Sequence, residues 1–249
     1  MKDFVEIVKK NYEDPSLILK AFDFACAAHK NMKRKSGEPY IIHPIAVAKA
    51  LIDLGLDDAT ISAALLHDVV EDTPVSFKQL KNEFGEEVEM LVKGVSKISG
   101  IKYNKPEVKE MNSLRRLFIS MSKDIRVILI KLADRLHNIR TVDSLKPERQ
   151  ISFCSETMNI FVPIAERLGL NTIKNEMENK CFSILRPNEY KKLKDELDRK
   201  FVKTTERIER VQAKLNEIME GAGLNFEVKS RLKHFYSLYK KIRDKGTGL

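Results

Sequence analysis

The segment from residue 125 to residue 141 constrains the fold most strongly, because it is long and mostly apolar. Its β-branched residues are typical of a strand, but its length and the acidic cap Asp124 favour a buried helix. In such a helix Asp134, Asn138 and Thr141 share one face, at spacings of four and three residues. An acid inside an apolar helix is costly unless it is paired or bound to a metal ion. The segment therefore predicts a buried helix whose acid has a partner or a metal.

A second helix is expected from Asp57 to Asp72, where an acidic cap precedes small and apolar residues. Residues four apart would share a face, so His67 would lie with Glu71, and Asp68 with Asp72. We expect one exposed strip with an imidazole and three carboxylates. The core-facing residues would be Leu65, Leu66, Val69 and Val70. The alternative is a surface helix end with ordinary acids, which the His67–Asp68 pair alone does not exclude.

The remaining sequence is also typical of helices. The chain has only 10 Gly, 8 Pro and no Trp, which argues against an architecture of strands and turns. An apolar stripe predicts a helix over residues 16–33, followed by a turn at residues 36–39. Pro44 in a first turn predicts a helix from His43 to about Gly55. Further helices are expected at residues 76–85, 86–95, 108–122, 147–168 and 172–185. A polar loop at residues 96–107 is expected to be mobile and near the site.

These patterns predict an all-α fold in three regions. Residues 1–186 would form the main helical bundle, and residues 187–222 a long, charged connector helix. Residues 223–249 would be the incomplete beginning of a second domain. Within it residues 225–228 favour a strand and residues 232–241 a helix, so we expect a small α/β fragment.

Composition narrows the partners and the compartment. The net charge of +9 and the pI of about 9.3 favour an anionic partner, such as nucleic acid, a membrane surface or a small polyphosphate. No apolar run approaches the ~20 residues of a membrane span, and the N-terminal residues are too polar for a secretory signal. Cys26, Cys154 and Cys181 are widely spaced and form no paired motif. We therefore expect reduced thiols in a cytoplasmic protein without a membrane partner.

Four side chains from three separate segments form a candidate metal site. They are His43 at a helix start, the adjacent His67 and Asp68, and Asp134. Two nitrogen and two oxygen ligands suit Mn²⁺, Fe²⁺ or Zn²⁺ better than Ca²⁺ or Mg²⁺. The set differs from closed, Cys-rich structural zinc sites, and would leave positions open for water and a substrate phosphate.

Three blocks of sequence carry a resemblance to a known family. Residues 34–44 (RKSGEPYIIHP), 66–73 (LHDVVEDT) and 131–141 (KLADRLHNIRT) resemble the signature blocks of the RelA/SpoT family. More narrowly, they resemble its N-terminal hydrolase domain, a member of the HD superfamily. The match runs in order over about residues 15–185.

The resemblance implies an all-helical hydrolase that removes the 3′-pyrophosphate of the alarmone (p)ppGpp with Mn²⁺ as its usual metal. It implies these metal ligands: His43, His67, Asp68 and Asp134. Glu71 and Asp72 would be the acidic pair that positions and activates water, and either could be the base. The nucleotide pocket would be lined by Arg34, Lys35, Ser36, Asn138, Arg140 and Thr141.

Residues 229–241 resemble the opening of the family's synthetase domain, so no synthesis of (p)ppGpp is expected from this chain. Other functions stay open. One is an HD phosphohydrolase that acts on another nucleotide, and another is a mainly regulatory fragment of a bifunctional enzyme. A third is a basic nucleic-acid-binding module with an inactive site, but the basic residues are interleaved with acids, which is typical of solvated faces. We expect no direct nucleic-acid contact, and ribosome association only through further domains.

Overall fold

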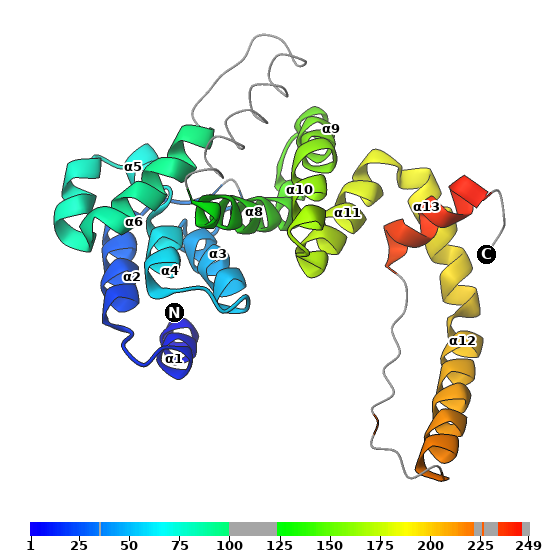
Figure 1. The fold of residues 1–249 in the computed structure, drawn as a ribbon. Helices are drawn as coiled ribbons and strands as arrows, with labels where there is room; N and C mark the ends of the chain where they lie inside the picture. Colours follow the sequence, from blue (N-terminus) through cyan, green and yellow to red (C-terminus); the bar gives the residue numbers. More distant parts are fainter. Residues whose placement is uncertain (35, 100–123, 222–225, 227–233, 246–249) are drawn as a thin grey trace. The chain divides into compact units, whose positions relative to one another are not determined.

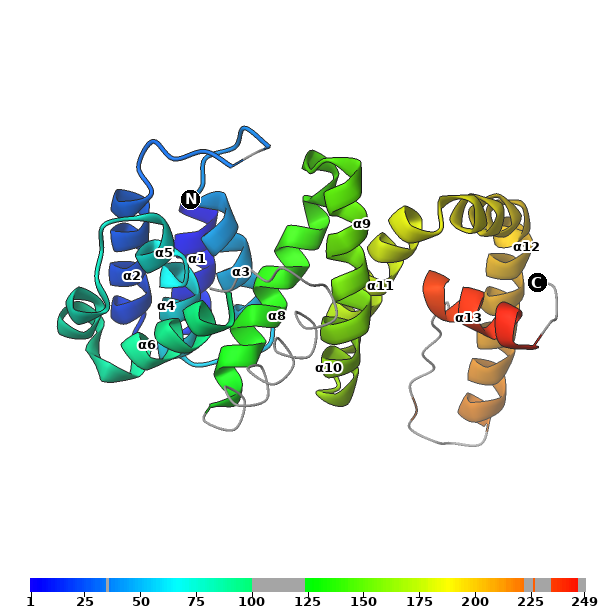
Figure 2. The ribbon, with the colours of Figure 1, turned by 90° about the horizontal axis from the view of Figure 1, so that it is seen from above.

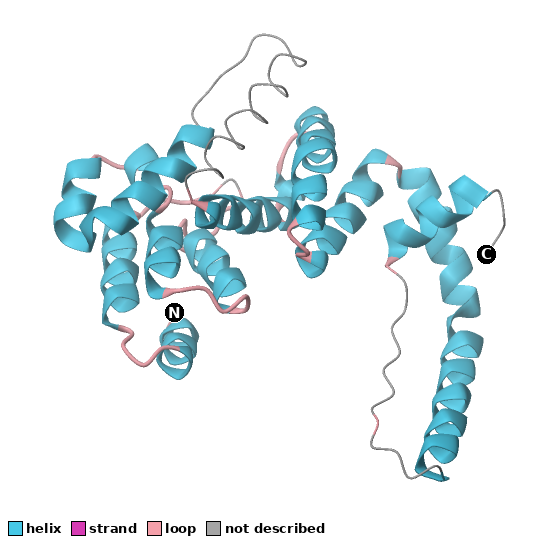
Figure 3. Ribbon diagram, viewed as in Figure 1, coloured by secondary structure: helices cyan, strands magenta, loops and turns pink. Residues whose placement is uncertain are grey.

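The computed structural model describes residues 1–34, 36–99, 124–221, 226 and 234–245 of the chain. Within these ranges the regular elements are all helices, and strands are absent (Figure 3). The predicted all-α fold is therefore confirmed. The chain divides into two compact units, Met1–Met177 and Glu178–Leu249. The domain boundaries expected at residues 186 and 222 stay predictions.

The first unit contains most of the helices. In chain order they are α1 (Lys2–Asn11), α2 (Ser16–Ala28), α3 (Ile42–Ile52), α4 (Asp58–Leu66), α5 (Val69–Asp72), α6 (Phe77–Ser99), α8 (Ile125–Arg140), the 3₁₀ turn η1 (Val142–Ser144), α9 (Pro147–Glu156), the π-helical segment η2 (Thr157–Phe161) and α10 (Val162–Arg167). Helix α11 (Asn171–Leu185) begins in the first unit and ends in the second. The sequence patterns did not predict α1.

Helix α4 is the centre of the core, and every residue from Ala59 to Leu66 is buried. Helices α2, α3 and α6 pack around it (Figure 1). A helix that is apolar on all sides must be covered in this way, and each large apolar side chain buried contributes about 1.5–3 kcal/mol. The acidic cap is confirmed, because the Asp57 carboxylate accepts a hydrogen bond from the Thr60 backbone N–H at 2.7 Å.

Helix α8 is the buried helix predicted from residues 125–141, and it packs against α3 and α6 (Figure 2). Asp124 caps it by accepting from the Arg126 N–H at 2.9 Å. The Arg126 guanidinium also reaches Glu87 at 2.7 Å and Asp57 at 3.2 Å. One arginine therefore joins the starts of α4 and α8 to α6, which fixes where α8 enters the core.

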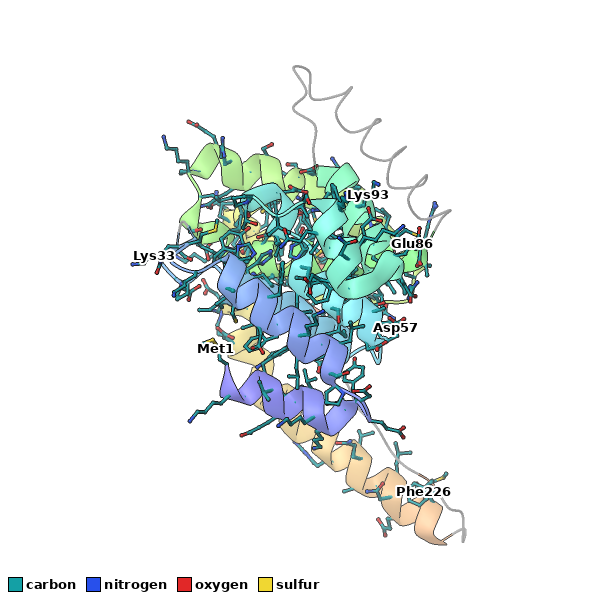
Figure 4. The ribbon with its side chains drawn as sticks, turned by 90° about the vertical axis from the view of Figure 1, so that its left-hand side faces the viewer. Met1, Lys33, Asp57, Glu86, Lys93 and Phe226 are labelled. Carbon is teal, nitrogen blue, oxygen red and sulfur yellow. The ribbon has the colours of Figure 1, made fainter. Side chains whose placement is uncertain are left out.

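Helix α2 is shorter than predicted and ends at Ala28 instead of residue 33. The chain reverses after it, with Asn31 in the left-handed region at φ 70°. The reversal is held by a backbone hydrogen bond from the Tyr40 N–H to the Met32 carbonyl at 2.9 Å. We call residues 29–41 the pocket loop, and Figure 4 labels Lys33 on it.

The helices expected at residues 76–85 and 86–95 form α6, interrupted at Gly85, whose φ of 87° is outside the helical region. Helix α6 continues to Ser99, so the first residues of the loop expected at 96–107 are helical. The rest of that loop and the helix expected at 108–122 lie outside the described residues. The helix expected at 147–168 is present as α9, η2 and α10, with π-helical geometry in its middle.

The second unit contains the end of α11, the long helix α12 (Pro187–Gly221) and α13 (Phe235–Lys245). The 35-residue α12 confirms the long helix predicted over residues 187–222, and its role as a connector stays a prediction. The Phe182 ring packs 4.4 Å from the Tyr239 ring, and the buried Glu178 pairs with Lys240 at 3.0 Å. The strand expected at 225–228 falls, except for Phe226, outside the described residues. None of the described helices is both long and apolar enough to cross a membrane.

Candidate metal centre and adjoining pocket

Four side chains meet where α3, α8 and the turn after α4 come together. Nε2 of His43 lies 3.2 Å from Oδ1 of Asp134 and 3.5 Å from Oδ2 of Asp68. Nε2 of His67 lies 3.2 Å from the same Asp68 oxygen. One ligand atom from each of His43, His67 and Asp134 lies within 4.8 Å of the other two. The structure thus brings together all four residues predicted as metal ligands, and their role as ligands stays a prediction.

His67 and Asp68 form a turn between two helices, so the prediction of one helix through residue 72 is wrong. Helix α4 ends at Leu66, and Asp68 has φ −97° and ψ −9°. The turn places His67 in the interior, where it is 1% exposed, and not on an exposed strip. Glu71 and Asp72 follow in α5 and are exposed. The acidic pair is therefore accessible to solvent, while the imidazole is not.

The environment of His67 fits a metal ligand. Its Nδ1–H donates to the Ala64 carbonyl at 2.7 Å, which fixes the ring orientation. Its Nε2 is buried and makes no hydrogen bond of normal geometry to a described residue, although the Asp68 carboxylate is close. Buried polar atoms normally have a partner. The two imidazoles and two carboxylates therefore fit a first-row divalent ion.

The charges of the cluster are set by competition between burial and neighbouring groups. Burial alone lowers the pKa of His67, but the Asp68 carboxylate outweighs it and the pKa rises to about 9. Burial would raise the pKa of Asp134, but the positive charge of Lys131 holds it well below its usual value. Burial is the main cause that lowers the pKa of His43. Both carboxylates are thus ionised and face a shared space that suits a cation.

Asp134 has the partner that a buried acid requires. Lys131 Nζ donates to its Oδ2 at 2.7 Å, and the Asn138 amide donates to its Oδ1. The sequence analysis did not identify Lys131 as this partner. The i, i+3 spacing on a helix is the signal that could have found it.

Tyr40 is a second residue that sequence reasoning missed. Its hydroxyl donates to Oδ2 of Asp68 at 2.8 Å, and its ring stacks on His29 with 4.6 Å between ring centroids. Burial and then the Asp68 charge raise the pKa of Tyr40, so the hydroxyl stays protonated and remains a donor. Tyr40 therefore holds the Asp68 carboxylate in place from the pocket loop.

A pocket of about 420 Å³ adjoins the cluster. It is lined by Lys33, Arg34, Ser36, Tyr40, Asn138, Thr141, Ser144, Leu145 and Phe153. Four of the six residues predicted to bind the nucleotide are in this set. Lys35 lies outside the described residues. Arg140 is not among the lining residues, because it is exposed and bonded to both carboxylate oxygens of Glu176, at 2.5 and 2.7 Å.

Arg34 connects the pocket to the metal centre. Its Nη2 donates to Oδ1 of Asn138, and its Nη1 lies 2.9 Å from Nδ1 of His137. Asn138 in turn donates to Asp134. The guanidinium is therefore held by two adjacent residues of α8, about 100 positions away in sequence.

Part of the pocket lining is apolar, and its Phe153 ring packs against Arg135. The Phe153 ring lies 3.8 Å from the Arg135 guanidinium carbon, and the Phe161 ring lies 4.3 Å from it. Arg135 also pairs with Glu156 at 2.7 Å. Sequence reasoning did not place Phe153 in the pocket, because α9 carries no motif residue there.

With this geometry in hand, comparison with known families identifies the fold. The HD domain family matches residues 21–171, which include all four residues of the cluster. The chain belongs to the HD domain family. Among curated relatives, the chain is 46% identical over 227 residues to the probable guanosine-3′,5′-bis(diphosphate) 3′-pyrophosphohydrolase of Synechocystis, covering 91% of this chain and 30% of that protein.

Two further similarities point the same way. The bifunctional (p)ppGpp synthase/hydrolase SpoT of Escherichia coli is 41% identical over 222 residues, 89% of this chain and 32% of that protein. The chain thus spans about a third of the length of these relatives. A solved structure described as a metazoan ortholog of SpoT that hydrolyzes ppGpp is 28% identical, with a TM-score of 0.53, and covers 71% of this chain and 97% of that one.

Proposed function

We propose that this chain is a hydrolase that removes the 3′-pyrophosphate of guanosine 3′,5′-bis(diphosphate) or its pentaphosphate form, giving GDP or GTP and pyrophosphate. One observation carries the proposal: a His/His/Asp/Asp cluster lies directly beside a basic pocket, and Arg34 joins the two. The similar proteins named above support the choice of substrate.

The metal is proposed to be Mn²⁺, held by His43, His67, Asp68 and Asp134, because mixed imidazole and carboxylate ligation suits it. When bound, such an ion lowers the pKa of water and polarises a phosphoryl oxygen. The chain's own contribution is to fix the ligands. Tyr40 and Lys131 hold the two carboxylates, and the Ala64 carbonyl orients His67.

Glu71 and Asp72 are proposed to align the attacking water and to accept its proton. Partial desolvation beside the cluster, and then the negative charge of Asp68, raise the pKa of Glu71, and we therefore assign the proton to Glu71. General base catalysis of this kind contributes about 10²–10⁴-fold. Asp72 would then hold the water in line with the leaving pyrophosphate.

The pocket is proposed to bind the nucleotide through its basic and amide groups, which offset the phosphate charges. This role is proposed for Arg34, Lys35, Ser36, Asn138 and Thr141. The guanidinium plane of Arg34 can also stack on a purine, which an ammonium group cannot do as well. Arg140 would first have to leave its ion pair with Glu176 to reach a nucleotide.

The cytoplasm is the proposed compartment. All three cysteines are free thiols, and two of them, Cys154 and Cys181, are buried. Free buried thiols are typical of reducing compartments.

The test is incubation of the protein with ppGpp, with Mn²⁺ or with a chelator, followed by identification of the products. We expect GDP and pyrophosphate with Mn²⁺ and no turnover in chelator. Asp68→Ala should lose both metal and activity, whereas Glu71→Ala should keep the metal and lose about 10²–10⁴-fold in kcat. The exposed Asp53 offers a matched control, and Asp53→Ala should behave like the parent.

Two results would contradict the proposal. Full activity in chelator would show that the reaction does not require a metal ion. Release of orthophosphate, or faster turnover of another 3′-phosphorylated nucleotide, would show an HD phosphohydrolase with a different substrate.

A further inference from the structure

His137 is a buried residue of α8 that none of the roles above uses. It is 8% exposed, and its Nδ1 is close to two other nitrogens. Nη1 of Arg34 and Nδ1 of His43 each lie 2.9 Å from it. Three nitrogens at these distances need a definite arrangement of protons.

The arginine decides that arrangement. A guanidinium has only N–H donors and no acceptor, so Nδ1 of His137 must accept from Arg34. The proton of the neutral His137 ring is therefore on Nε2. Because the lone pair of His137 Nδ1 also faces His43, an unprotonated His43 Nδ1 would place two lone pairs 2.9 Å apart. Nδ1 of His43 must then carry the proton and donate it to His137.

The consequence appears on the other side of the His43 ring. With the proton on Nδ1, Nε2 of His43 presents a lone pair to the ionised oxygens of Asp134 and Asp68, at 3.2 and 3.5 Å. A lone pair facing two carboxylates is unfavourable unless a cation lies among them. The hydrogen bond to His137 thus selects the form of His43 that a metal ion requires.

We propose that His137 is a positioning residue of the metal centre, which fixes the tautomer and orientation of His43 by accepting a hydrogen bond from it, and is itself fixed by Arg34. His137 touches neither metal nor substrate in this role. The inference rests on the proposed metal centre, but not on the identity of the nucleotide.

The first test reads the tautomers directly in the unmodified protein. The chain has only five histidines, so ring nitrogens can be assigned by ¹⁵N NMR at neutral pH, with His137→Asn to identify one ring system. We expect an unprotonated Nδ1 and a protonated Nε2 for His137, and a protonated Nδ1 for His43, both before and after addition of diamagnetic Zn²⁺. A proton on Nδ1 of His137 would overturn the proposal.

The second test separates the acceptor from the shape of the ring. The amide oxygen of His137→Asn can replace the accepting Nδ1, whereas His137→Phe fills the space but cannot accept. Metal affinity is read without substrate, from the rise in melting temperature on titration with Mn²⁺. We expect His137→Phe to weaken metal binding about 10–100-fold, as for the loss of other groups that orient metal ligands, and His137→Asn to stay close to the parent.

The outcomes are distinct. Equal metal binding by His137→Phe and the parent would show that the ring only packs, and equal weakening in both variants would show that the acceptor is irrelevant; either result overturns the inference. If the Phe variant does not fold, the tautomer measurement still decides. A parent protein that binds neither Mn²⁺ nor Zn²⁺ would overturn the metal centre itself, and this inference with it.

Discussion

The proton on His67 should make the stability of the metal-free protein depend on pH in a specific direction. His67 is 1% exposed, and the adjacent Asp68 raises its pKa from 6.5 to about 9 against the effect of burial. Because the pKa is higher in the folded state, this pair contributes stability that is fully present below pH 6.5. That stability is lost as the pH rises through about 9.

The magnitude follows from the size of the shift. The pKa rises by roughly 2.5, and a pKa difference of one corresponds to about 1.4 kcal/mol, which gives about 3.5 kcal/mol for the whole effect. Asp68→Asn removes the charge but keeps the shape and a hydrogen-bond acceptor for Tyr40. In the variant the imidazole should be neutral across the same range, so this contribution disappears.

The assay is urea denaturation of both proteins in chelator, at pH 6 and at pH 9.5. The parent should lose about 3 kcal/mol more free energy of unfolding than Asp68→Asn over this range. Subtracting the variant removes the contributions of other titrating groups, because Asp68 itself stays ionised throughout. With saturating Mn²⁺ the parent should lose this decline, because ligation needs the neutral imidazole. Parallel pH profiles of the two metal-free proteins would refute the reasoning.

Three further outcomes are expected. Arg34→Lys should raise KM for ppGpp at least tenfold in steady-state kinetics, since a hydrogen bond to a charged group contributes about 1.5–3 kcal/mol, whereas Arg140→Lys should leave KM nearly unchanged. Leu65→Ala, at a fully buried site, should lower the free energy of unfolding by about 2–5 kcal/mol in urea; Leu54→Ala, at a site 39% exposed, should cost about 0.5 kcal/mol or less. Gly94→Ala should lower the free energy of unfolding by about 1–3 kcal/mol, because its Cβ would lie 2.7 Å from a methyl carbon of Val127. Adding Val127→Ala should recover part of that loss. A melting temperature above that of the parent for Gly94→Ala alone would contradict the close packing of α6 on α8.

The metal cluster could be predicted from sequence because each of its ligands lies in a short segment with a recognisable pattern. The adjacent His67 and Asp68, the helix start at His43 and the acid in an apolar helix are each visible within a few residues. The resemblance to a known family then joined them. The structure brings these residues together, and the metal titrations described above test their role as ligands.

The turn at His67 could not be predicted in the same way. Periodicity shows which residues share a face if a helix continues, but it does not show where the helix ends. Here the helix ends at Leu66, so that His67 can point inward while Glu71 and Asp72 remain exposed. The end of α4 thus goes with the burial of His67 in the tertiary structure, which the local sequence pattern does not show.

Residues that support the site were the hardest to find. Tyr40 and Phe153 act through contacts with Asp68 and Arg135, which lie 28 and 18 positions away. Arg140 is the opposite case, since it lies in a signature block but is bonded to Glu176 and not directed into the pocket. A residue in a sequence motif is expected to lie near the site, but only its contacts in the structure show whether its side chain enters the pocket.

The anchoring of Arg34 to α8 has a consequence for how the protein is made. The two bonds span 103 and 104 residues of sequence, so the pocket loop has no native partner for its arginine until residues 137 and 138 have been synthesised and have docked. Contacts between such distant positions form slowly, because a long loop must close first. A nascent chain of the first hundred residues would therefore contain three of the four candidate ligands. It would lack the fourth ligand and a complete nucleotide pocket. The last step in forming the site would be the docking of α8.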